Sequence, residues 1–80
     1  MMEDYWEKFN LLCSELEAEG KQNLVSELRK AQSYVNGLTD GWYDFLNSFE
    51  KAMTSQKLDN LTQQLANTLI ETLKNRLNNR

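Results

Sequence analysis

The chain has 80 residues, of which 40% are apolar, 10% aromatic and 26% charged. Single hydrophobic cores become marginal below about 60 residues, so this length allows one core and we predict a single domain over residues 1–80. The aromatic content can fill a packed core and argues against disorder, although the mean hydropathy is -0.70.

The chain contains no proline and only three glycines, so few residues are available to interrupt helices or to form hairpins. Apolar residues recur at spacings of three and four in successive segments, which is the period of an amphipathic helix. We therefore predict an all-α fold with helices over about 3–19, 22–36, 40–53 and 55–78. Short connections of about two to five residues would make sequential helices antiparallel, as in an up-down-up-down four-helix bundle.

The first two predicted helices have clear ends. Gly20 follows the first apolar stripe, and glycine readily takes the left-handed conformation that ends a helix. The second helix should end at Asn36–Gly37, with Leu38 making the apolar contact that often accompanies a glycine cap. The lone cysteine lies on the first stripe, so we interpret it as a buried hydrophobe. That stripe consists of Tyr5, Trp6, Phe9, Leu12, Cys13 and Leu16.

The third and fourth predicted helices each begin near a capping residue. Thr39 or Asp40 can accept hydrogen bonds from the free amides of the third helix, and Thr54 or Ser55 can do so for the fourth. The fourth helix would be about 36 Å long, against about 22 Å for the others. Its leucines recur mostly every four residues, and each such step advances about 40° around the helix, so Leu61 and Leu77 should point in different directions.

Two surface features are candidate interaction sites. We expect Ile70, Leu73 and Leu77 to form a C-terminal apolar patch that three shorter helices leave uncovered, which would suit association, including a homodimer through the last helix. The alternative is that this patch closes the base of the chain's own core.

The second feature is the group Tyr43, Asp40 and Asp44, which would form an acidic aromatic epitope for a cationic partner. The simpler interpretation, which we favour, is that Trp42 and Phe45 are core residues, Tyr43 packs half-exposed, and the two aspartates are helix caps.

Catalytic and cofactor chemistry has no support in the sequence. The chain has no histidine and one cysteine, so the commonest general base is missing and no zinc site of the usual kind can form. The three glycines do not form a phosphate-binding loop. Pairs of acids one turn apart are typical of solvated helix faces or caps. We predict no enzyme activity, no cofactor and no metal.

The charge balance bears on partners. A net charge of -3 and a sequence pI near 4.8 argue against nucleic acid, for which Lys21, Arg29 and Lys30 would be the only place to look. No apolar run approaches the about 20 residues that span a bilayer, and the acidic start lacks a secretory signal, so we expect no membrane partner and a cytoplasmic location.

The sequence therefore predicts a small helical protein that acts by protein-protein interaction with another protein or with itself. An acidic inhibitor or immunity-type protein for a basic partner is one alternative, and a regulatory nucleic-acid-associated protein is another.

Overall fold

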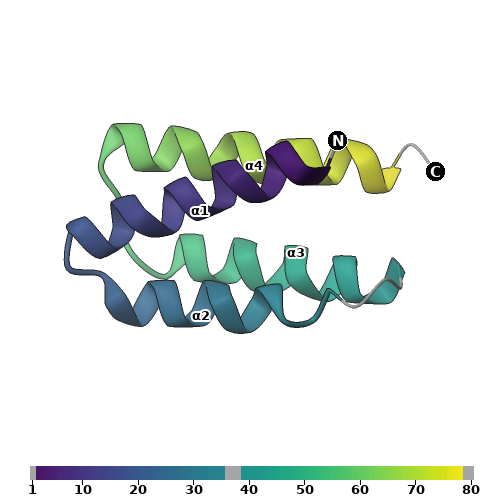
Figure 1. Cartoon of the computed structure of the whole chain (residues 1–80), viewed down its shortest axis with the longest axis horizontal. Helices are drawn as coiled ribbons and strands as arrows, with labels where there is room; N and C mark the ends of the chain where they lie inside the picture. Colours follow the sequence, from purple (N-terminus) through teal and green to yellow (C-terminus); the bar gives the residue numbers. More distant parts are fainter. Residues whose placement is uncertain (1, 36–38, 79–80) are drawn as a thin grey trace.

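A computed structural model describes residues 2–35 and 39–78, and helices account for most of them. The helices are α1 (Met2–Ala18), α2 (Gln22–Gln32), α3 (Thr39–Thr54) and α4 (Asn60–Asn78). Each helix packs against its neighbours in the chain, and α4 also packs against α1, which closes the bundle into a ring (Figure 1). The predicted all-α helical bundle is confirmed.

The helices that are neighbours in the ring run in opposite directions. The chain reverses at every connection in Figure 1, and α4 lies alongside α1 with its own start near the end of α1. Hydrogen bonds fix this register. The Tyr5 hydroxyl, near the start of α1, donates to the carbonyl of Leu69 in α4 at 3.1 Å. The Thr62 hydroxyl, near the start of α4, donates to the carboxylate of Glu19, just beyond α1, at 2.6 Å.

Gly20 ends α1 as predicted, and its backbone conformation is the reason. Its φ is 80°, in the left-handed region that residues with a Cβ rarely adopt. The Lys21 amide donates to the Leu16 carbonyl at 2.9 Å, and the Gly20 amide donates to the Glu17 carbonyl at 3.0 Å. These two bonds are the Schellman pattern, which satisfies carbonyls that the helix end would otherwise leave free.

The predicted extent of α2 is too long, because the helix ends at Gln32 instead of residue 36. Beyond Gln32 the backbone hydrogen bonds join residues that are three positions apart. The Tyr34 amide donates to the Ala31 carbonyl at 3.0 Å, and the Val35 amide donates to the Gln32 carbonyl at 3.1 Å. The predicted stop at 36–37 and the predicted contact of residue 38 lie outside the described residues.

The predicted start of α4 is also wrong, because the helix begins at Asn60 and not at residue 55. The hydroxyls of Thr54 and Ser55 donate back to carbonyls of α3 three residues earlier, at 3.0 and 2.7 Å, so they close α3 and do not cap α4. Asp59 is the cap: its carboxylate accepts the amide of Thr62 at 2.8 Å. The residues between them form a connection.

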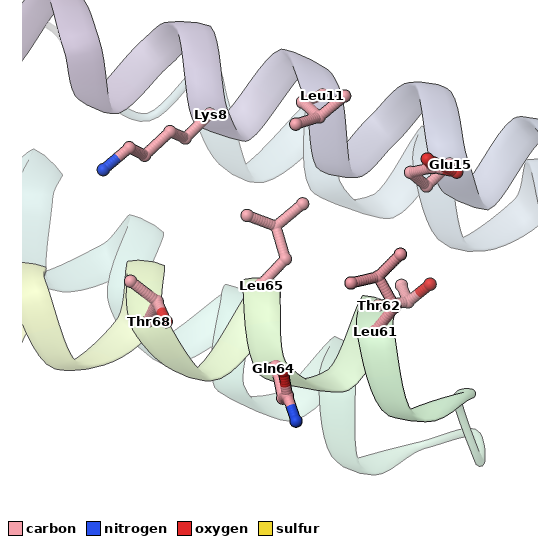
Figure 2. A pocket seen from close by; sticks show the side chains of 8 residues that line it. All are labelled: Lys8, Leu11, Glu15, Leu61, Thr62, Gln64, Leu65 and Thr68. Carbon is pink, nitrogen blue, oxygen red and sulfur yellow. The ribbon is translucent and has the colours of Figure 1, made fainter.

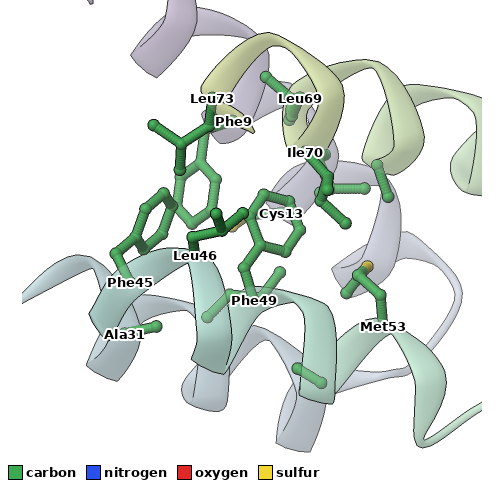
Figure 3. Packing of buried hydrophobic residues seen from close by; sticks show 14 of the residues in the cluster. Phe9, Cys13, Ala31, Phe45, Leu46, Phe49, Met53, Leu69, Ile70 and Leu73 are labelled. Carbon is green, nitrogen blue, oxygen red and sulfur yellow. The ribbon is translucent and has the colours of Figure 1, made fainter. Parts of the chain in front are cut away.

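Aromatic side chains from α1 and α3, which lie diagonally across the bundle, fill its centre. Trp6 stacks on Trp42 with ring centroids 5.5 Å apart, and Phe9 meets Phe45 edge to face at the same centroid separation. Leu69 and Leu73 of α4 pack near these rings (Figure 3), and leucines of α2 belong to the same buried cluster. The largest fully buried hydrophobic side chains are Phe9, Leu12, Leu16, Leu24, Leu28, Phe45, Phe49, Leu69 and Leu73.

Candidate interaction surfaces

The expected C-terminal patch is not a surface. Ile70, Leu73 and Leu77 are 8%, 1% and 8% exposed, so they belong to the chain's own core and the expectation of an uncovered patch is wrong. The cause is helix length: α4 has 19 residues against 17 in α1 and 16 in α3, which leaves little overhang. The start of α3 lies beside the end of α4, where the Tyr43 hydroxyl donates to the Leu77 carbonyl at 3.4 Å.

The leucine row on α4 does rotate as predicted, but its exposed end is the opposite one. Leu61 is 69% exposed, whereas Leu77 is buried. The core face of α4 is set by residues that include Ala66 and Leu73, and Leu61 falls well away from that face on a helix with 3.6 residues per turn. The apolar surface of this helix therefore lies at its N-terminal end.

The acidic aromatic group lies on the outer side of α3, at its first turns. Tyr43 is 41% exposed, and Asp40 and Asp44 are both exposed. Phe45 is buried and Trp42 is half-buried against the core. The arrangement keeps the two carboxylates in water, one helical turn apart, beside a tyrosine whose hydroxyl is tethered to α4.

A groove between α1 and α4, absent from the sequence prediction, carries the most exposed leucines of the described residues. Leu11 on α1 is 53% exposed and Leu61 on α4 is 69% exposed. Figure 2 shows Leu65 and Thr62 of α4 pointing toward α1, whereas Gln64 points away from it. The groove has a volume of about 390 Å³. We call it the α1–α4 groove and define it by Lys8, Leu11, Glu15, Leu61, Thr62, Gln64, Leu65 and Thr68.

The two charged residues of the α1–α4 groove lie at opposite ends. In Figure 2, Lys8 lies at one end, on the side of Thr68, and Glu15 lies at the other end. Leu11 and Leu65 lie between them, from opposite walls. The groove is thus cationic at one end, anionic at the other and apolar in the middle.

The α4 wall of the groove is free of charge. Residues 60–70 contain no Asp, Glu, Lys or Arg, in a chain with 26% charged residues. The exposed side chains of this stretch are leucine, threonine or amides. Binding this wall to another apolar surface would leave no charge to desolvate, which is the condition under which buried interface centres form.

A polar contact holds the two walls together at the anionic end. Thr62 is only 2% exposed, and it donates its hydroxyl to Glu19 and its amide to Asp59. The hydrogen bond from the Thr62 amide, helped by the nearby Lys21 ammonium, holds the pKa of the Asp59 carboxyl below its ordinary value. The start of α4 is therefore held against the end of α1.

Of the three basic residues considered for nucleic acid, Arg29 contributes to packing. Its guanidinium donates to the side-chain oxygen of Asn10 at 2.7 Å and to that of Gln32 at 3.1 Å. It also lies over the Phe9 ring, 5.7 Å from the centroid. This cation therefore joins α2 to α1 and is not free on the surface.

The buried titratable side chains are arranged for packing. Cys13 is 1% exposed, and its burial raises the pKa of the thiol, which favours the unreactive neutral form. Tyr5 is 4% exposed, and burial raises the pKa of its hydroxyl.

Within residues 2–35 and 39–78 no three side chains of the types that ligate metals are grouped to hold an ion. No helix there is long and apolar enough to cross a membrane.

The signal for the α1–α4 groove was present in the sequence in two places. Leu11 falls outside the apolar stripe of the first helix, and residues 60–70 lack charge. Neither signal shows by itself that the two lie together, because this depends on α4 closing the ring against α1.

No protein-family model, no curated protein and no solved structure matches the chain.

Proposed function

We propose that this protein is a non-enzymatic helical module that acts by binding another protein, and that the α1–α4 groove is its binding surface. The observation that supports this most is the exposure of Leu11 and Leu61 on opposite walls of one groove. Exposed apolar side chains gathered on one face commonly mark an interaction surface. The absence of charge over residues 60–70 adds to this argument, because interface centres are depleted of charged residues.

The affinity would come from covering the two leucines. Burying a leucine side chain completely stabilises by about 1.5–3 kcal/mol, and more than half of each residue is still exposed, so the pair would contribute about 2–4 kcal/mol. A partner that presents apolar side chains between the walls would displace water from both. The contact of Thr62 with Glu19 supports this mode, since it holds the two helices together before a partner binds.

The test compares proteins retained by the wild-type chain with those retained by a Leu11→Gln/Leu61→Gln double variant. Both substitutions are at exposed positions, so the variant should keep the helical content of the wild type. Tyr34→Gln is the matched control, because Tyr34 is 38% exposed and lies just beyond α2, away from the groove. We expect cross-linking and sedimentation to show a partner, self or other, that the control retains and the double variant loses. Equal retention by all three would contradict the proposal.

We also propose a cytoplasmic location for this module. An unpaired cysteine in a small domain is compatible with a reducing compartment, where disulfides are rare. Fractionation of cells that express the full-length protein would test this, and recovery in a membrane or secreted fraction would contradict it.

A second candidate function is neutralisation of a basic partner through Tyr43, Asp40 and Asp44. The exposure of both carboxylates beside a tethered, half-exposed tyrosine favours it. Such binding would weaken steeply with added salt and would be lost on Asp40→Asn/Asp44→Asn. A partner whose binding is unaffected by added salt and by Asp40→Asn/Asp44→Asn would argue for the groove instead.

A further inference from the structure

We propose that the occupant of the α1–α4 groove is a second copy of this chain, related by a two-fold axis that passes through the groove midway between Lys8 and Glu15. This inference rests on the proposed function of the groove as a binding surface. It is carried by the order of side chains along α1, where a cation, a leucine and an anion follow one another along the groove.

A two-fold axis places each end of the groove against the opposite end of its copy. Lys8 and Glu15 both line the groove on the side of α1 that faces α4, so an axis midway between them brings Lys8 of one chain opposite Glu15 of the partner subunit. The same operation places Glu15 of the first chain opposite Lys8 of the partner subunit. One groove thus forms two ion pairs with its own copy, and each Leu11 lies beside the axis.

The charged ends are available for this pairing. Within residues 2–35 and 39–78 neither Lys8 nor Glu15 has an ion-pair partner. They are separated by about 10 Å along the helix axis, at 1.5 Å per residue, which is too far for contact within one chain. An arbitrary apolar partner would leave both charges unmatched, whereas a second copy matches both at once.

The α4 wall accommodates the copy without repulsion. Residues 60–70 carry no charge, so Leu61 and Leu65 can approach the partner subunit with no like charges between them. Exposed ion pairs add little affinity themselves. The leucines therefore supply the attraction, and the two Lys8–Glu15 pairs set the direction in which the chains meet.

Charge reversal tests this geometry in a way that other interfaces would not reproduce. Sedimentation equilibrium from about 10 µM to about 1 mM covers the range of weak complexes. We expect reversible dimers of the wild-type chain. Lys8→Glu alone and Glu15→Lys alone should each raise the dimer dissociation constant at least about tenfold. Each variant places like charges opposite each other at both of the paired positions in the dimer. The Lys8→Glu/Glu15→Lys double variant should return it to within about threefold of the wild type.

Mixing the two single variants provides a second readout. Each chain then offers the charges that the other needs, so the equimolar mixture should dimerise where neither variant does alone. Lys30→Glu on α2 is the matched control and should dimerise as the wild type does. Circular dichroism on every variant shows whether the fold is retained.

Two results would overturn the proposal. A wild-type chain that stays monomeric up to about 1 mM rules out the second copy, and the groove's function still stands if another protein is lost on Leu11→Gln/Leu61→Gln. A dimer that is insensitive to both charge reversals has its interface elsewhere. The proposed function fails separately, when the leucine double variant loses no partner of any kind.

Discussion

Two adjacent leucines on α1 should differ greatly in how much the same substitution changes stability. Leu12 is 0% exposed, within the core, and Leu11 is 53% exposed in the groove. Leu12→Ala removes buried methyl groups and leaves a cavity, which should lower the free energy of unfolding by about 2–5 kcal/mol. Leu11→Ala removes a half-exposed side chain and introduces the best helix former, so the change should stay below about 1 kcal/mol.

Urea unfolding followed by circular dichroism measures both values, at a concentration low enough to keep the chains apart. An 80-residue domain has a total stability of about 4–12 kcal/mol, so Leu12→Ala would remove a large part of it. Equal m-values for the two variants would show that the unfolded states are comparable. A loss of more than about 2 kcal/mol for Leu11→Ala would refute the reasoning, because it would mean that Leu11 is buried in the monomer.

Three further predictions concern the backbone and the titratable groups. Gly20→Ala should lower stability by about 1–2 kcal/mol through backbone strain alone, because φ is 80° and nothing lies within 4 Å of the added Cβ. Gly20→Asn should lose less stability. Equal stability of both variants and the wild type would contradict this. Tyr5→Phe should cost about 0.5–1.5 kcal/mol at neutral pH through loss of the bond to Leu69. Because burial raises the pKa of Tyr5 above its ordinary 10.0, this residue's contribution is present below pH 10 and is lost as the pH rises further, so the wild type should lose stability faster than Tyr5→Phe above pH 10 in urea titrations. For Asp59 the pH dependence has the opposite sign, because its pKa is lowered: its contribution to stability is present above the ordinary pKa of 3.8 and is lost as the pH falls through the folded value. Asp59→Asn keeps a capping oxygen, so this variant should lose less stability than the wild type as the pH falls. An equal loss in acid for the two chains would count against the Asp59 cap.

The fold could be predicted because its determinants are local. The apolar period of each segment and the left-handed glycine at residue 20 are both written in neighbouring residues. The start of α4 could not be predicted in the same way. Thr54, Ser55 and Asp59 are all good capping residues, and which of them caps α4 depends on whether the hydroxyls bond back to α3.

The surfaces could be predicted only in part. The rotation of the α4 leucines followed from helix geometry, and the exposure of Tyr43, Asp40 and Asp44 agrees with a position on an outer helix face. The exposed end of the leucine row was assigned wrongly, because the length of α4 depends on the Asp59 cap. The α1–α4 groove needs the contact between the first and last helices, which no local pattern encodes.

The most direct test of the groove as the site of self-association is a dilution series of backbone amide spectra of the ¹⁵N-labelled chain. Self-association through the groove predicts that amide shifts at Lys8, Leu11 and Leu65 change with concentration, while those of Tyr34 and of α2 stay constant. Shifts that move instead on α2 and α3, or that stay constant everywhere up to about 1 mM, would contradict it.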